Sequence, residues 1–106
     1  MSEERYNKGD RSVDDHIVYI GSKPFMNYVT GVVMQFTTQG ANEVVVKARG
    51  RFISRAVDIV EVSTKRFLEG QVKLKENGIK IDSEEFTNKE GKQVRVSTIE
   101  ISLVKK

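Results

Sequence analysis

The chain has 106 residues, about the size of one domain, with 38% hydrophobic residues, 31% charged residues and a net charge of +3. It has no cysteine and one histidine, which excludes disulfides, thiolate metal sites and multi-histidine zinc sites. No apolar run approaches the roughly 20 residues of a membrane-spanning helix, and the first ten residues lack a signal-peptide core. We therefore expect a soluble intracellular protein that needs no cofactor.

Charge is unevenly distributed along the chain. Residues 1–15 carry three basic and five acidic side chains and little that can be buried, which predicts a flexible polar tail before a single domain over residues 16–106. Segment 47–55 holds four basic residues and no acid. Such a cluster is typical of a phosphate-binding surface, and it also occurs on ordinary solvated faces.

The first half of the domain reads as two strand–helix units, in keeping with 15 valines and eight isoleucines against three leucines. Residues 16–20 suit a strand buried on both faces, and Pro24 stands where a helix over 25–39 begins. Residues 43–48 suit a second strand. A second helix follows and ends near Gly70, with one apolar stripe formed by Ile53, Val57, Val60, Thr64 and Phe67.

The last third reads as strands. Asn77-Gly78 interrupts an alternating pattern, and this pair either closes a hairpin of its own or bends one long strand. A turn over 88–91 precedes the final strand, in which the apolar parity changes near Thr98. That change indicates a bulge or burial of both faces towards the end of the strand. The order is β-α-β-α-β-β, a single α+β domain in which right-handed crossovers place two helices on one face of a four-stranded mixed sheet.

Two loops between strands and helices carry the strongest chemical pattern. Gly21-Ser22-Lys23-Pro24 precedes a helix, whose positive end attracts anions, so Lys23 is either a phosphate contact or an idle exposed lysine. Arg49-Gly50-Arg51 presents two guanidinium groups suited to phosphate oxygens. Since both loops leave the same sheet edge, Lys23, Arg49 and Arg51 should converge. Arg55 has a plainer explanation, an ion pair with Asp58 three residues later.

The turn over 88–92 would project a ribbon that carries Lys89, Lys92 and Arg95. Such a ribbon can enter a DNA groove, but lysines on a strand edge also protect against aggregation. Tyr28, like Phe25 and Phe52, would stack on bases if exposed, although aromatic residues at helical spacing usually belong to the core. No nucleophile has a base and an orienting partner, so we expect no enzyme activity.

Three segments together resemble the archaeal chromatin protein family called Alba: YIGSKPFMNYV at 19–29, KARGRFISRAVD at 47–58 and VSTIEI at 96–101. The resemblance implies a fold similar to the C-terminal domain of a translation initiation factor. It also implies a homodimer, or a heterodimer with a paralogue, that coats and compacts the chromosome in the cytoplasm. The implied ligand is double-stranded DNA, bound with little sequence preference, and often RNA as well.

Carried over by position, the resemblance assigns backbone contacts to Lys23, Arg49 and Arg51, and minor-groove contacts by the hairpin more loosely to Lys92 and Arg95. Phe67 matches an aromatic position at which dimers associate side by side. The full set of expected nucleic-acid contacts is Ser22, Lys23, Tyr28, Lys47, Arg49, Arg51, Arg55, Lys89, Lys92 and Arg95.

Two positions depart from the family pattern. The family loop usually reads Gly-Lys-Lys-Pro with the first lysine acetylated, whereas Ser22 stands there in this chain, which leaves Lys23 as the candidate for modification. Asn77-Gly78 resembles a local insertion that changes the hairpin. Two other functions stay open: an RNA-specialised protein acting on structured RNA or a ribonucleoprotein, and a small domain or enzyme that holds a phosphorylated ligand in the same loops.

Overall fold

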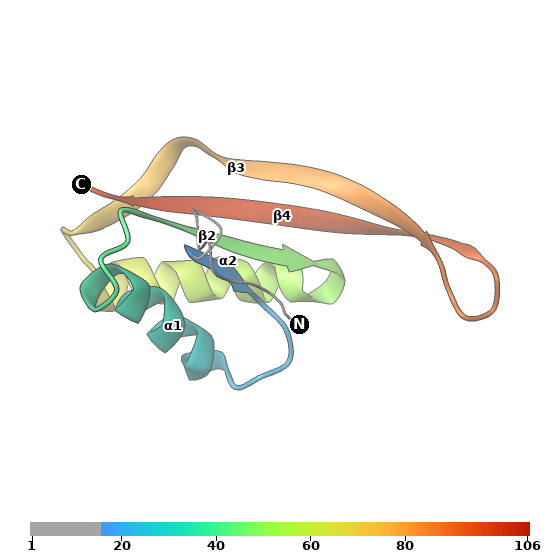
Figure 1. Cartoon of the computed structure of the whole chain (residues 1–106), viewed down its shortest axis with the longest axis horizontal. Helices are drawn as coiled ribbons and strands as arrows, with labels where there is room; N and C mark the ends of the chain where they lie inside the picture. The colour runs from blue at the N-terminus through green and yellow to red at the C-terminus, as the bar shows by residue number, and fades with distance from the viewer. Residues whose placement is uncertain (1–15) are drawn as a thin grey trace.

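The computed structural model describes residues 16–106, so the tail predicted for residues 1–15 lies outside the described part. The elements follow the predicted β-α-β-α-β-β order (Figure 1). They are β1 (Ile17–Tyr19), α1 (Phe25–Thr37), β2 (Glu43–Arg49), α2 (Ile53–Val62), β3 (Val72–Thr87) and β4 (Gln93–Lys105). A 3₁₀ turn (Gly50–Phe52) leads into α2, and a π-helical turn (Ser63–Phe67) extends it.

The four strands form one mixed sheet in the order β1-β2-β4-β3. β1 runs parallel to β2 with Tyr19 beside Lys47, whereas β4 runs antiparallel to both β2 and β3. Both helices pack on one face, where alternate residues of the central strands are buried: Val44, Val46, Ala48, Ile99, Ile101 and Leu103. The predicted fold class is confirmed.

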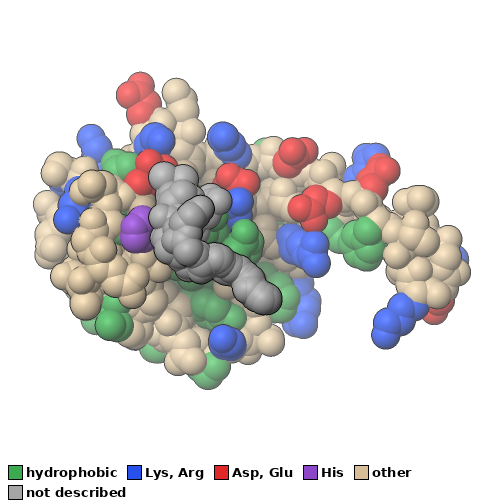
Figure 2. All heavy atoms as spheres, in the orientation of Figure 1, with side chains coloured by type: hydrophobic (Ala, Val, Ile, Leu, Met, Phe, Trp, Pro, Cys, Tyr) green, Lys and Arg blue, Asp and Glu red, His purple; other side chains and the backbone are tan. Residues whose placement is uncertain are grey.

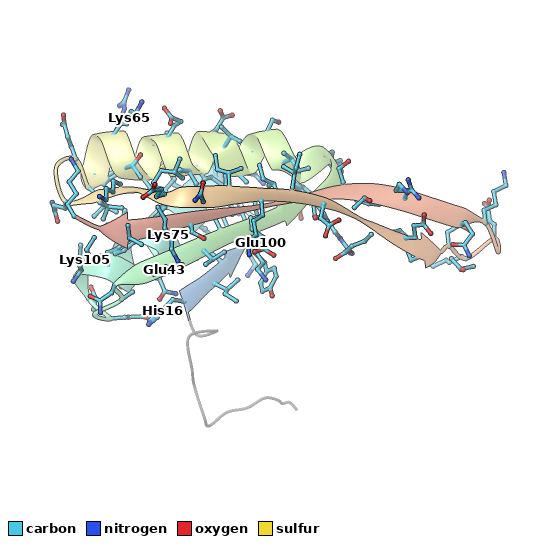
Figure 3. All side chains as sticks on the ribbon, turned by 90° about the horizontal axis from the view of Figure 1, so that it is seen from above. His16, Glu43, Lys65, Lys75, Glu100 and Lys105 are labelled. Atoms are coloured by element: carbon cyan, nitrogen blue, oxygen red, sulfur yellow. The ribbon has the colours of Figure 1, made fainter. Side chains whose placement is uncertain are left out.

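The opposite face of the sheet has no helix over it in residues 16–106. Glu43 of β2 and Lys75 of β3 form an ion pair there, with Oε1 and Nζ 3.3 Å apart, and Glu100 of β4 lies on the same face (Figure 3). Tyr19 of β1 also belongs to this face and is 68% exposed, so the interpretation of residues 16–20 as a strand buried on both faces is wrong. β1 is an edge strand that the helices cover from one side only.

The apolar stripe predicted for the second helix is wrong in part. Ala56, Ile59, Val60 and Ser63 are the buried residues of α2 and its π-helical turn, whereas Val57 is 41% exposed and Phe67 is 49% exposed. The predicted stripe left out Ala56, Ile59 and Ser63. Ala56 and Ser63 are small, and small side chains let the helix approach the sheet closely.

Asn77-Gly78 bends one long strand and does not close a hairpin. Asn77 has φ 57°, and the pairing of β3 with β4 shifts between Leu74 and Ile79. A Cβ on Gly78 would lie 2.5 Å from the Lys75 carbonyl oxygen, so the bulge requires glycine at this position. Neither alternative expected near Thr98 is found. β4 has no bulge there, because it pairs with β3 without a break from Gln93 to Ile101, and only Ile99, Ile101 and Leu103 are buried while the residues between them are partly exposed.

The last paired residue of β2 is Arg49, opposite Thr98, and β3 and β4 continue beyond it as a two-stranded ribbon. We call residues 83–97 the arm; it extends well past the helices (Figure 1). In its turn, Asn88 Oδ1 accepts hydrogen bonds from the N–H groups of Glu90 and Lys92, at 2.9 and 3.0 Å. None of the helices in residues 16–106 has the length and apolarity to cross a membrane.

Candidate nucleic-acid interface

The two loops that hold the predicted phosphate contacts lie at one edge of the sheet. β1 and β2 are parallel, so both strands end there, and the Ile20 N–H donates to the Lys47 carbonyl at 2.9 Å just before the first loop begins. We call Lys23, Arg49, Arg51 and Arg55 the cationic edge. Segment 47–55, which supplies three of these four residues, contains no acid.

Tyr28 anchors the first loop to the core. Its ring is 8% exposed in the core, and its hydroxyl oxygen accepts hydrogen bonds from the N–H groups of Gly21 and Lys23, at 3.0 and 3.1 Å. Stacking of Tyr28 on a base would need an exposed ring, so the structure supports the other interpretation, that Tyr28 belongs to the core. The residue instead holds the backbone from which Ser22 and Lys23 project.

Arg55, in the first turn of α2, contacts the first loop. Its guanidinium donates a hydrogen bond to the Gly21 carbonyl, and its Cζ lies 5.6 Å from the centre of the Tyr28 ring. Within residues 16–106 it forms no ion pair with Asp58, so the plainer explanation from the sequence is wrong. The first turn of α2 is therefore tied to the loop that precedes α1. Convergence of Lys23, Arg49 and Arg51 stays a prediction.

Lys23 lies beside the amino end of α1. The first turn of that helix contains no acidic residue, and no side chain caps it. The positive end of the helix dipole therefore adds to the lysine charge, an arrangement that favours an anion. Lys23 has no carboxylate partner among residues 16–106.

The two arginines of the second loop differ in their partners. Arg49 Nη1 lies 3.0 Å from Glu84 Oε1 on β3, whereas Arg51 Cζ lies 4.5 Å from the centre of the Phe52 ring and has no carboxylate partner in the described part of the chain. Gly50 between them has φ 60°, which glycine adopts without strain. This conformation turns the chain from β2 into α2 with an arginine on each side.

The arm is electrically balanced. Lys89, Lys92 and Arg95 are its three cations, and three glutamates match them. Arg95 Nε donates to Glu85 Oε2 at 3.0 Å, which neutralises the only arginine of the arm. Figure 2 shows acidic and basic side chains interspersed along the side of the molecule that leads to the arm.

Lys47 lies on the open face of the sheet, apart from the loops. Its Nζ is 3.6 Å from Glu100 Oε2 and 5.8 Å from the centre of the Tyr19 ring. Three residues beside the expected contacts were not predicted: Tyr19 next to Lys47, Glu84 next to Arg49 and Glu85 next to Arg95. Strand alternation would place Glu84 and Glu85 on opposite faces, but only the register between β3 and β4 reveals which arginine each one reaches.

Comparison with known proteins gives the family. The sequence model of Alba matches residues 16–81. This chain belongs to the Alba family. The matched region contains the whole cationic edge and ends before the arm.

Individual relatives of this Alba-family chain agree over most of its length. It is 64% identical to the DNA/RNA-binding protein Alba of Nanoarchaeum equitans, over 84% of this chain and 97% of that protein. It is 52% identical to the DNA/RNA-binding protein Alba of Methanococcus maripaludis, over 86% of this chain and 99% of that protein. Alba from Thermoplasma volcanium superposes with a TM-score of 0.74 at 42% identity, covering 83% of this chain and 98% of that one. ALBA1 from Trypanosoma brucei superposes with a TM-score of 0.61 at 25% identity, covering 85% of this chain and 68% of that one.

An apolar hollow of about 490 Å³ separates α2 from β3 in this Alba-family fold. Val57, Val60, Leu74, Ile79, Ile101 and Leu103 are among its lining residues. Val57, Leu74 and Ile79 are each more than two-fifths exposed, which is unusual for neighbouring large apolar side chains. Phe67 is exposed on the π-helical turn at the end of α2.

Proposed function

We infer that this protein binds double-stranded DNA, and RNA as well, through backbone phosphates and without strong sequence preference, as an architectural protein that coats and compacts the chromosome in the cytoplasm. The observation that carries this proposal is the cationic edge. Tyr28 holds the loop that carries Lys23, and Arg55 ties the first turn of α2 to that loop. Lys23 and Arg51 have no carboxylate partner in residues 16–106. Two archaeal relatives are named DNA/RNA-binding proteins, which supports the same ligand class.

Each cation of the edge has a physical role in the proposal. Lys23 acts together with the amino end of α1, and Arg49 and Arg51 present planar donors to phosphate oxygens. Ser22 adds a hydroxyl donor, and Arg55 holds the loop in place while it contributes charge. Lys47, Lys89, Lys92 and Arg95 extend the contact beyond the edge. Lys23 is also the proposed site of modification, since acetylation would remove a charge at the helix end.

The proposed assembly is a homodimer whose two subunits cover each other's apolar hollow between α2 and β3. Val57, Leu74 and Ile79 are the residues that would become buried, and burial of such side chains is the main driving force for association. Ile79→Asp should give a folded monomer, because this side chain is already 52% exposed in one chain. Phe67 is proposed to act between dimers, so Phe67→Ala should reduce cooperative coating and leave the dimer intact.

The decisive experiment is fluorescence anisotropy with a DNA duplex of about 20 base pairs and its RNA equivalent, titrated at several salt concentrations. We expect log K to fall linearly with log salt, with a slope of about −0.9 for each phosphate contact on DNA, and similar affinity for unrelated DNA sequences. A clear preference for the RNA duplex would favour the RNA-specialised function. Failure to bind either duplex at low salt would overturn the proposal.

A further inference from the structure

Tyr19 is the most exposed aromatic side chain of residues 16–106 and plays no part in the cationic edge. Its ring lies on the open face of the sheet, because Val18 next to it packs towards the core. Tyr19 lies opposite Lys47 in the parallel pairing, and the Lys47 Nζ lies 5.8 Å from the ring centre. The face of the Tyr19 ring that is turned away from Lys47 has no role in the cationic edge.

A hollow of about 420 Å³ lies beside this ring. It is lined by Tyr19, Lys47, Arg49, Glu84, Thr98 and Glu100, which come from all four strands. Glu100 lies near the end of β1, where Tyr19 stands (Figure 3). The hollow therefore combines an aromatic surface and a hydroxyl with two cations and two carboxylates, which form the exposed ion pairs Lys47–Glu100 and Arg49–Glu84 that a ligand would replace.

These groups match the parts of an unpaired nucleotide. A base stacks on an exposed aromatic ring, arginine and lysine bind its phosphate, and a carboxylate accepts hydrogen bonds from an exocyclic amino group such as that of cytosine. The four-stranded sheet of RRM domains binds single-stranded RNA in this way, through aromatic residues on its open face. A base within a duplex cannot reach Tyr19, because both of its faces are already stacked.

We propose that the hollow on the open face binds an unpaired base of single-stranded nucleic acid, stacked on Tyr19 and selected for an amino group by Glu100. The inference deepens the proposed function, because it adds a second class of nucleic acid at a second surface. Arg49 connects the two surfaces, since it belongs to the cationic edge and also lines the hollow. A strand that leaves a duplex end or a loop would then be held next to the duplex.

The test compares single-stranded 12-nucleotide oligocytidine and oligouridine with the 20-base-pair duplex, by anisotropy on the full chain. Tyr19→Ala should weaken oligocytidine binding by about 5- to 100-fold and leave duplex affinity unchanged, because stacking contributes only to the unpaired ligand. Tyr19→Phe should keep the affinity, since the ring and not the hydroxyl is used. Met34→Ala, which truncates an exposed apolar side chain on α1, is the matched control and should change neither ligand.

Selection of the base has its own readout. Glu100→Gln should reduce the preference for oligocytidine over oligouridine, because an amide presents one acceptor where the carboxylate presents two. Equal single-strand affinity for wild type and Tyr19→Ala overturns the inference, as does an equal loss on both ligands. The two proposals can fail separately. If the wild-type protein does not bind the duplex but its binding to oligocytidine depends on Tyr19, the proposed function is contradicted and this inference stands.

Discussion

The cationic edge and the arm were both expected to contact nucleic acid, yet they differ in charge and in how they are held. The edge concentrates four cations in two loops and the first turn of α2, and segment 47–55 is free of acid. The arm carries as many glutamates as basic residues. Attraction to phosphate therefore has its main source at the edge, and the arm can add position and shape with little net charge.

The same contrast appears in the contacts. At the edge, Tyr28 and Arg55 bind backbone groups of the first loop and are themselves anchored in helices that pack on the sheet. In the arm, two strands support each other without a third, and a two-stranded ribbon is only marginally stable alone. A rigid edge keeps its cations in place before the ligand arrives, whereas the arm can adjust to the groove that it meets.

The largest effect is expected at the edge. Replacing Arg49 and Arg51 together by alanine should weaken binding to all duplex sequences by about 50-fold at roughly 0.1 M salt, and it should lower the salt slope by about 0.9 for each phosphate that is no longer neutralised. The melting temperature should hardly change, since exposed ion pairs such as Arg49–Glu84 contribute little to stability. Unfolding of this variant would show that the arginines are structural.

A smaller effect is expected in the arm. Lys89→Ala combined with Lys92→Ala removes two cations, the same number as the double arginine variant, yet we expect only about a five- to tenfold loss of duplex affinity. The reason is that the arm glutamates already offset part of the local potential. Anisotropy at matched salt concentrations compares the two variants directly. An equal or larger loss of affinity in the arm variant would show that the arm contributes at least as much to duplex binding as the edge.

The order of elements and the position of the edge followed from the sequence because both rest on local patterns. Strand alternation, helical spacing and the glycines at loop ends identified the units, and parallel strands bring their loops to one edge. The contacts of Tyr28 and Arg55 and the exposure of Tyr19 were not predicted, because they depend on partners distant in sequence. The Tyr28 hydroxyl is buried, Arg55 bonds a carbonyl 34 residues earlier, and β1 is an uncovered edge strand. None of these features produces a periodic pattern in the sequence.

Removal of the Tyr28 hydroxyl tests whether binding needs a rigid edge. Tyr28→Phe keeps the buried ring and removes the acceptor for the N–H groups of Gly21 and Lys23. We expect a loss of stability of about 1–2 kcal/mol, measured by urea unfolding, because two partly buried donors lose their partner. Duplex affinity should fall about threefold, since Lys23 is then held less firmly. Unchanged affinity would show that the loop needs no fixed geometry.

The smallest effect tests how the arm acts on the edge. Glu84 belongs to the arm but pairs with Arg49, so a carboxylate must be displaced before that arginine can bind phosphate. Glu84→Gln should therefore raise duplex affinity by about two- to threefold and steepen the salt slope. Glu76→Gln is the matched control, because it removes the same charge from β3 at a residue without an ion pair in residues 16–106. If both variants gain equally, net charge alone explains the effect; if only Glu84→Gln gains, the arm restrains the edge through this one contact.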